Sequence, residues 1–259
     1  MKSLLLTLLT TLGTYASTEA AILFADDFSG DAAPLNGTTP DTTTGGATWT
    51  SGAAFLASGI VSTTPTSGAW LPFVPTAGNI YTVSSSMNTT AGGQNWISLG
   101  FSAAATALPT NRFADGPVVA LGTLLLRQNR GSGTGATDAQ FFVGETTLGT
   151  TSIAAPPTGA ISARITLDAS NPSPALWTLG LSLNGAPISL VTNSNPADGS
   201  DAGTDISNFG SIKFVGFTVT NTAGGTVDDF RVEVTPVPEP SSALLVGLGA
   251  MGLMRRRRS

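Results

Sequence analysis

The sequence predicts an all-β protein built as an antiparallel β-sandwich, and three observations lead to this fold class. Short runs of apolar or alternating residues recur about every dozen positions between residues 22 and 235, a spacing typical of sandwiches and barrels. Clusters of turn-forming residues separate the runs, and the chain holds 31 Gly and 16 Pro. No apolar stripe with helical spacing continues beyond two turns, so helices are not expected in this part of the chain.

Twelve segments have the length and composition of strands. Most are rich in Val, Ile, Leu, Phe and Thr, the residues that suit a pleated and half-buried surface. In chain order they are residues 22–28, 54–61, 69–73, 80–87, 96–101, 118–127, 140–145, 160–168, 177–183, 188–192, 212–219 and 226–234.

Two of these segments carry the clearest patterns. Residues 161–167 alternate apolar and polar side chains, as in a strand with one buried and one wet face, and Arg164 is expected in solvent. Residues 177–183 place Trp177 and three leucines on one face. Asn184 and Gly185 follow, and this pair suits the two positive-φ positions of a type I′ turn. A hairpin is therefore predicted, with residues 187–190 as the returning strand.

The apolar positions of residues 212–219 change phase along the segment. Ile212 and Phe214 set one alternation, whereas Val215, Phe217 and Val219 set the other. The change predicts either a bulge near Phe214 or a strand that is buried on both faces.

The first twenty residues are predicted to be a secretory signal peptide and not part of the fold. Lys2 supplies a short basic region, and residues 4–12 are apolar apart from threonines. Thr18 and Ala20 offer small side chains at the positions that a signal peptidase reads, so the mature chain is expected to begin near Ala21. Nine mostly apolar residues are too few to span a bilayer of about 30 Å as a helix.

The other end combines a rigid acidic turn, an apolar segment and a basic cluster. Pro238 and Pro240 end any paired strand and hold Glu239 on an extended stalk. Residues 243–254 are apolar, with three glycines, and are short of the ~20 residues of a spanning helix. A hydrophobic helix that anchors only transiently is predicted. The basic residues that would stay on the cytoplasmic side are Arg255, Arg256, Arg257 and Arg258.

These three parts, in this order, resemble the PEP-CTERM sorting signal of exported bacterial proteins. The resemblance covers residues 236–259 and implies recognition by an exosortase-type enzyme through the motif Pro238, Glu239 and Pro240, with a cut before, within or after that motif. It implies passage through the export machinery, transient anchoring in the inner membrane and a final place at the cell surface, outer envelope or extracellular matrix. Residues 21–235 are then the folded domain.

The order of patterns in residues 161–234 resembles the laminin-G or concanavalin-A-like jelly roll. An alternating strand is followed by a loop, a strand ending in Asn184-Gly185 and a return strand. Two similar phrases, Asp26-Asp27-Phe28 and Asp228-Asp229-Phe230, stand near the two ends of the domain. They would lie together if the first and last strands were neighbours, as the resemblance implies. A shared fold does not by itself indicate function.

Composition excludes several chemistries. The chain has no His and no Cys, which rules out Ser-His-Asp and Cys-His nucleophiles, disulfides and zinc centres that use these ligands. The net charge is −5, with 14 acidic and 6 basic residues between positions 22 and 235, and this balance argues against a nucleic-acid partner.

A non-catalytic protein is predicted, with a secreted glycoside hydrolase of concanavalin-A-like fold as the alternative. Glycoside hydrolysis needs two acids about 5–10 Å apart, and the domain has only two glutamates, Glu145 and Glu233, on separate predicted strands. The Glu-x-Asp-x-(x-)Glu strand in which jelly-roll glucanases resemble one another is missing. Asp228 and Asp229 are adjacent on a predicted strand, so their side chains are expected on opposite faces.

No cofactor is required, but Ca²⁺ is the small ligand that this composition would suit, because it takes oxygen donors. The candidate ligands are Asp198, Asp201 and Asp205, in a loop rich in Asn, Asp and Gly. The competing interpretation is a polar connection whose side chains cap its own turns. A second group is Asp26, Asp27, Asp228 and Asp229, between the terminal strands.

Aromatic side chains could stack on sugars only if exposed. Trp177 is expected in the core, and burial is the default expectation for Trp49 and Trp70 as well, although both adjoin Gly- and Thr-rich segments. Taken together, the sequence predicts an exported surface or matrix protein, associated with exopolysaccharide as the tail implies, and weakly carbohydrate-binding at most.

Overall fold

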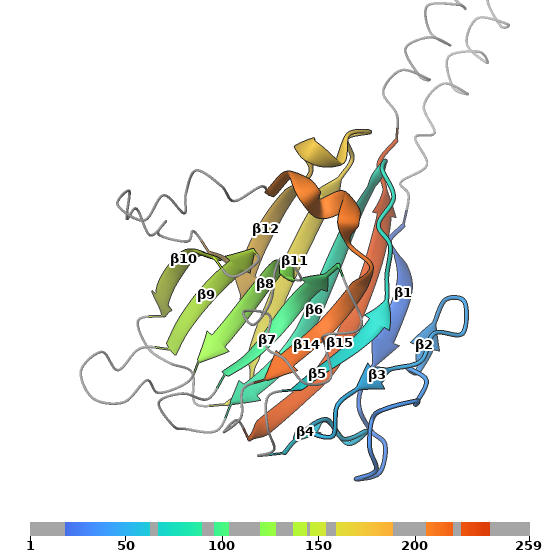
Figure 1. Cartoon of the computed structure of the whole chain (residues 1–259), viewed down its shortest axis with the longest axis vertical. Coiled ribbons are helices and arrows are strands. Elements are labelled where there is room, and N and C mark those ends of the chain that lie inside the picture. Colours follow the sequence, from blue (N-terminus) through green and yellow to red (C-terminus); the bar gives the residue numbers. More distant parts are fainter. Residues whose placement is uncertain are drawn as a thin grey trace, which may run out of the picture.

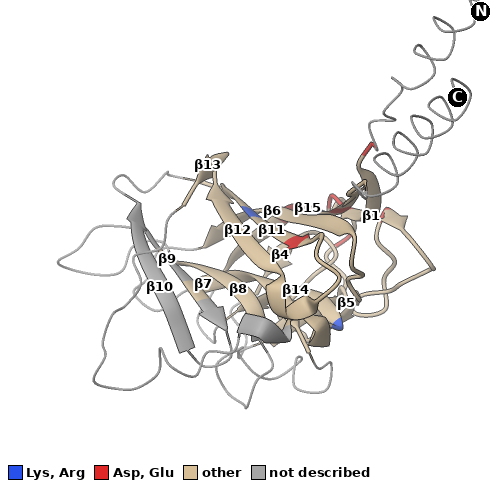
Figure 2. Ribbon diagram, turned by 90° about the horizontal axis from the view of Figure 1, so that it is seen from above, with Lys and Arg blue, Asp and Glu red and all other residues tan. Residues whose placement is uncertain are grey.

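The computed structural model describes residues 19–62, 67–89, 96–103, 120–127, 137–143, 146–153, 159–188, 206–219 and 224–238. Within these ranges the chain is almost entirely strand, and the strands form two antiparallel sheets packed face to face (Figures 1 and 2). The prediction of an all-β antiparallel sandwich is confirmed. Two short 3-10 helices complete the described part, η1 (Pro174–Leu176) and η3 (Ile206–Ser211).

The eight-stranded sheet contains both terminal strands of the domain. Its order is β13-β12-β11-β6-β15-β1-β2, and β4 also pairs with β15. The strands are β1 (Ala21–Asp26), β2 (Thr42–Thr43), β4 (Ile60–Val61), β6 (Asn79–Thr89), β11 (Ile161–Ala169), β12 (Thr178–Leu183), β13 (Ala186–Pro187) and β15 (Gly225–Pro236).

The seven-stranded sheet forms the second layer, in the order β10-β9-β8-β7-β14-β5-β3. Its strands are β3 (Thr50–Ser51), β5 (Ser67–Pro72), β7 (Trp96–Ser102), β8 (Ala120–Arg127), β9 (Thr137–Val143), β10 (Thr146–Ile153) and β14 (Phe214–Val219).

The alternation read in residues 161–167 is the burial pattern of β11. Its odd-numbered residues are buried, its even-numbered residues are partly or fully exposed, and Arg164 lies in solvent as predicted. The turn of the predicted hairpin is also present: Leu183 of β12 pairs with Ala186 of β13, and Asn184 and Gly185 have φ values of 49° and 78°. The predicted return strand is described only up to residue 188, and its remainder lies outside the described residues. The Asn184 side chain accepts a hydrogen bond from the Ser162 backbone N–H at 2.9 Å, which ties the turn to β11.

The phase change in residues 212–219 has the second of the two predicted causes. The pairings of β14 with β5 and with β7 run without a register shift, so there is no bulge at Phe214. Every residue from Val215 to Val219 is buried, and the polar Thr218 hydroxyl lies 2.6 Å from that of Ser98 on β7. A strand buried on both faces reads as a continuous apolar run.

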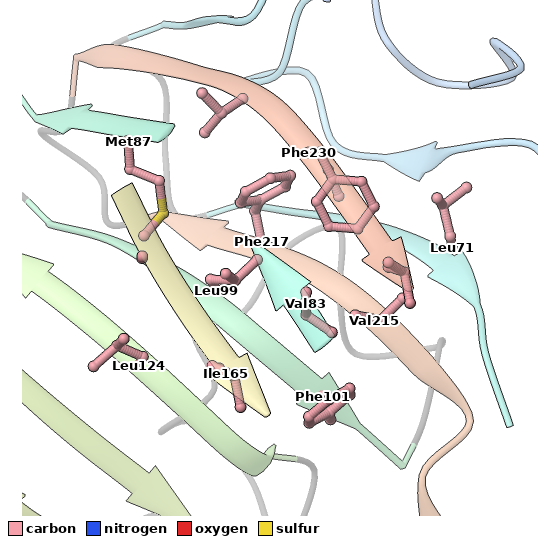
Figure 3. Close-up of a cluster of buried hydrophobic side chains, with 14 of the residues drawn as sticks. Leu71, Val83, Met87, Leu99, Phe101, Leu124, Ile165, Val215, Phe217 and Phe230 are labelled. Atoms are coloured by element: carbon pink, nitrogen blue, oxygen red, sulfur yellow. The ribbon is translucent and has the colours of Figure 1, made fainter. Parts of the chain in front are cut away.

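The core lies between the two sheets and combines aliphatic side chains with aromatic rings (Figure 3). Phe217 of the seven-stranded sheet and Phe230 of the eight-stranded sheet are both at most 1% exposed, and their ring centroids are 5.2 Å apart. The rings of Phe73 and Phe101 stack at 5.6 Å. Ring pairs at these separations are stabilising beyond the area they bury.

Residues 54–61 do not form the continuous strand expected from their apolar content. Only Ile60 and Val61 are assigned to a strand, and Phe55 bridges back to Val61 across a tight turn. Gly59 makes that turn with a φ of 71°, which an L-residue rarely adopts. The strand β10 was not predicted, since Thr and Gly dominate its sequence.

Candidate functional site

The first and last strands of the domain are neighbours, which brings the two Asp-Asp-Phe phrases together. In the β1–β15 pairing Ala21 lies opposite Val234 and Asp26 opposite Phe230. The rings of Phe28 and Phe230 both pack against Trp49, with centroids 5.9 and 5.1 Å away. The expectation that these phrases lie together if the terminal strands are neighbours is therefore met.

Backbone irregularities mark both phrases. Phe28 and Asp229 have φ values of 48° and 49°, an uncommon conformation for residues other than Gly. The pairing of β15 with β6 shifts register between Asp228 and Arg231, so an extra residue bulges from β15. The expectation that Asp228 and Asp229 face opposite sides was wrong, because the bulge breaks the alternation and both are exposed.

Asp26 is an acid held at the edge of the aromatic core. It is 8% exposed; its Oδ2 accepts a hydrogen bond from the Trp49 indole Nε1 at 2.7 Å, and its Oδ1 accepts one from the Phe28 N–H at 2.9 Å. Loss of hydration on burial raises the pKa of Asp26 above its ordinary value, and this effect outweighs the two hydrogen bonds that favour the carboxylate. The nearby carboxylates of Asp41 and Asp27 raise it further.

Three carboxylates converge at this point, and we call Asp26, Asp27 and Asp41 the acidic cluster. One oxygen from each lies within 4.8 Å of the others. Asp41 Oδ2 also accepts a hydrogen bond from the Asp27 N–H at 3.0 Å, and hydrogen bonds with Ser29 lower the pKa of Asp27. Oxygen donors in this arrangement are those that Ca²⁺ or another hard cation takes.

The acidic cluster lines a hollow of about 280 Å³, and Asp229 and Arg231 are also in its lining. Of the second predicted metal group, the structure thus unites Asp26 and Asp27 and brings Asp229 to the same hollow. Asp41 was missed. It precedes β2, a two-residue strand beside β1, and nothing in the Thr-rich local sequence indicates that pairing.

The first predicted calcium group lies in a part of the chain that the structure does not describe. Asp198, Asp201 and Asp205 lie outside the described residues, and so does Glu145 of the glycoside hydrolase alternative. Its predicted partner Glu233 is described, and its Oε1 lies 2.7 Å from Nε of Arg231 on the same strand.

No Trp or Tyr ring among the described residues is exposed for stacking on a sugar. All four tryptophans are buried, with exposures of 1–7%, and Tyr81 is 4% exposed. The default expectation of burial for Trp49 and Trp70 is confirmed. Trp177 is buried too, and its indole N–H donates to the Asn171 carbonyl oxygen at 2.8 Å.

The tail begins where the last strand ends. Pro236 lies opposite Asn79 in the β15–β6 pairing, and the Val237 N–H donates to the Gly78 carbonyl oxygen at 2.8 Å. Pro238 is exposed. Glu239, Pro240 and the arginines Arg255, Arg256, Arg257 and Arg258 lie outside the described residues, as does the predicted signal sequence up to residue 18. No helix among the described residues is long and apolar enough to cross a bilayer.

Solved structures with a similar fold are carbohydrate recognition domains and a galectin-like protein. The Emp47p carbohydrate recognition domain is 14% identical, with a TM-score of 0.50 over 87% of this chain and 100% of that chain. A galectin-like protein of unknown function from Bacillus subtilis is 12% identical, with a TM-score of 0.45 over 83% and 97% of the chains. The VIP36 exoplasmic/lumenal domain, in a Ca²⁺/Man2-bound form, is 12% identical, with a TM-score of 0.46 over 86% and 90%.

The fold is therefore a jelly roll like that of the Emp47p domain, as the sequence patterns predicted. No curated protein sequence matches the chain. A family model does match the tail, over residues 236–258, and its description is the PEP-CTERM protein-sorting motif. The match starts at the last residue of β15, so the chain carries a PEP-CTERM sorting motif that adjoins its jelly-roll domain without a linker.

Proposed function

We propose that this protein is exported, sorted through its C-terminal segment by an exosortase-type enzyme and delivered to the cell surface or extracellular matrix. The observation that carries the proposal is the sorting motif at residues 236–258, which directly continues the last strand of a sandwich. The export machinery and a signal peptidase act first, at the predicted signal peptide. The apolar tail then anchors the chain in the inner membrane until it is processed.

The domain itself acts without catalysis in this proposal and associates with extracellular polysaccharide. The outer face of the eight-stranded sheet is the surface best suited to such a ligand. Arg164, Ser84 and Arg231 form a row across β11, β6 and β15, so the two arginines are two strand spacings, or about 10 Å, apart. The neighbouring outward positions that carry hydroxyl groups are Thr82, Ser86, Ser162, Thr166 and Ser182.

On this surface Arg164 and Arg231 are the groups that would bind the acidic residues of a polysaccharide, and the acids Asp168, Asp228 and Glu233 share the same face. Guanidinium groups pair with carboxylates, and one bond from Arg231 to Glu233 leaves its other N–H donors available. Because the domain exposes no described Trp or Tyr ring, sugars would be held by hydrogen bonds and charge alone, and weak binding is the expectation.

Mass spectrometry of the protein from culture medium and membrane fractions tests the sorting proposal. The mature protein is expected to lack the residues beyond about Pro240, and Glu239→Gln is expected to accumulate as the unprocessed form in the membrane. Glu233→Gln, six residues away but outside the matched motif, should be processed like the wild type. A full-length C-terminus in the medium would contradict the proposal.

Retention on immobilised alginate, with neutral dextran as the comparison, tests the polysaccharide surface. The wild type is expected to be retained on alginate and released by salt, as contacts between exposed charges are screened. The double variant Arg164→Ser/Arg231→Ser should lose retention, whereas Lys213→Ser, which removes an exposed cation outside this face, should keep it. Equal retention of both variants would refute the assignment of this surface.

A bound cation is the second part of the proposal, and the acidic cluster favours it. Three carboxylates in a hollow are suited to Ca²⁺, which would offset the repulsion between them. The loop acids Asp198, Asp201 and Asp205 remain the other candidate ligands.

A further inference from the structure

The chain enters and leaves the sandwich at the same end, which is the upper end in Figure 1. Ala21 begins β1 and lies opposite Val234, two residues before β15 ends. We call this the exit end. Asp26, at the other end of β1, lies opposite Phe230, so the acidic cluster is about 17 Å from the exit end at the usual rise per strand residue.

The point at which the tail leaves is fixed by a rigid turn between β5 and β6. Gly78 accepts the bond from Val237 and donates its own N–H to the Ala169 carbonyl oxygen of β11 at 2.8 Å. The Asn79 side chain bonds to Thr76 at 3.0 Å, and Tyr81 accepts a hydrogen bond from the Thr76 N–H at 2.9 Å. These bonds hold the chain against the turn before β6 as far as Val237.

The exit end carries two of the three large hydrophobic residues that are exposed in the described part of the chain. Three large hydrophobic residues are exposed in the described part of the chain, Val74 at 57%, Leu176 at 63% and Ile60 at 46%. Val74 follows the end of β5, and Leu176 lies on η1, just after the end of β11 that pairs with Asn79. Ile60 is at the opposite end, where it pairs with Thr226.

A hollow of about 370 Å³ lies beside Val74 at the same end. Apolar side chains make up much of its lining, including Leu23, Phe73 and Val234. Lys213 is exposed, and its backbone carbonyl oxygen accepts a hydrogen bond from the Phe73 N–H at 2.8 Å. Exposed apolar side chains at one end of the domain, with the acidic cluster near the other, suit contact with the headgroup region of a bilayer.

The length of the tail brings this end close to lipid. Five residues separate Val237 from Ala243, where the apolar segment begins, and the six steps along the chain span at most about 20 Å. We propose that, while the tail is anchored, the exit end rests on the headgroup region of the bilayer, with Val74 and Leu176 in contact with lipid. This inference rests on the membrane anchoring in the proposed function. It adds an orientation, in which the acidic cluster points away from the membrane.

The absence of Cys in the chain allows a clean labelling experiment. Single-cysteine variants Val74→Cys, Leu176→Cys and the control Ile60→Cys are made in the full chain, labelled with a small fluorophore and mixed with vesicles of phosphatidylethanolamine and phosphatidylglycerol. Flotation in a density gradient, compared with a chain that ends at Val237 and keeps the same N-terminus, reports insertion of the tail. Quenching by a lipid with a nitroxide on its headgroup reports contact of each label with the surface. All three sites are exposed, so the substitutions should not disturb the fold.

The expected result is that all three variants float and that the labels at residues 74 and 176 lose several-fold more emission than the label at residue 60. Flotation with equal quenching at all three sites would overturn the orientation alone. It would leave this end free for the processing enzyme or a second copy of the chain. Failure to float would overturn the anchoring, and with it the inference.

Discussion

Trp49 and Asp26 are joined by a hydrogen bond of 2.7 Å from the indole N–H to the carboxylate, between the centre of the aromatic core and the end of β1. Trp49 is 1% exposed, and its ring contacts Phe28, Phe217 and Phe230. The indole therefore packs the core with its rings and satisfies a buried acid with its only polar atom. A buried carboxylate is costly to leave unpaired, so Asp26 depends on its two donors, this indole and the Phe28 N–H.

Replacing Trp49 by Phe is expected to lower the free energy of unfolding by about 1–3 kcal/mol beyond the effect of the smaller ring, because it leaves a desolvated carboxylate short of a donor. Chemical denaturation at pH 7 measures this loss. Trp177→Phe is the matched control, since its N–H donates to a neutral carbonyl oxygen. Equal losses of unfolding free energy in the two variants would show that the charge of Asp26 does not increase the cost of losing the indole donor.

The raised pKa of Asp26 predicts a specific pH dependence. Between the ordinary value of 3.8 and the raised value, the unfolded chain has released its proton while the folded chain keeps it. Stability from this group is thus fully present below pH 3.8 and is lost as the pH rises through the folded pKa. Asp26→Asn abolishes the titration, so the wild type should lose stability relative to the variant across this interval.

Melting temperatures of both proteins at a series of pH values, with a chelator present, measure that difference. Asp27→Asn serves as the control with the opposite sign. The pKa of Asp27 is lowered by hydrogen bonds with Ser29, so its contribution is present above pH 3.8 and is lost only as the pH falls through the lowered value. A wild type that gains stability over Asp26→Asn as the pH rises above 3.8 would contradict the burial argument.

Local sequence patterns were enough to predict the strand that has one buried and one exposed face, the turn that follows β12 and the sorting motif in the tail. Residues 161–167 and the Asn184-Gly185 turn each carry their structural information within about ten residues, through alternation and positive φ. The sorting motif is likewise a linear signal, and the match to residues 236–258 agrees with it. Features of this kind need no knowledge of the packed structure.

The candidate metal site depends on tertiary pairing and was only half predictable. Asp26 and Asp27 stand out as a phrase, but Asp41 joins them because two threonines pair with Phe24 and Ala25. The bulge at Asp229, which breaks the alternation of β15, depends on its pairing with β6. The sequence Asp228-Asp229 alone therefore does not indicate whether the strand bulges there.

Calcium is expected to raise the melting temperature, since a ligand that binds only the folded state adds about 2.7 kcal/mol at 100 times its dissociation constant. Calorimetry with Ca²⁺ and with a chelator measures the shift. Asp41→Asn should abolish it, whereas Asp31→Asn, an exposed acid outside the acidic cluster, should retain it. A shift that survives Asp41→Asn but not Asp201→Asn would move the site to the loop, and no shift in the wild type would remove calcium from the proposal.

Gly59 closes the turn that sets Phe55 against Val61, and its replacement by Ala is expected to be strongly destabilising. Its φ of 71° is unfavourable for Ala, and a Cβ atom there would lie 2.3 Å from the Val227 carbonyl oxygen on β15. Gly37→Ala is the matched control, with a φ of 84° and no atom within 4 Å of the added Cβ. Backbone strain alone costs about 1 kcal/mol, so denaturation should show about that loss at Gly37 and a clearly larger one at Gly59. Equal losses would mean that β15 can move aside without cost.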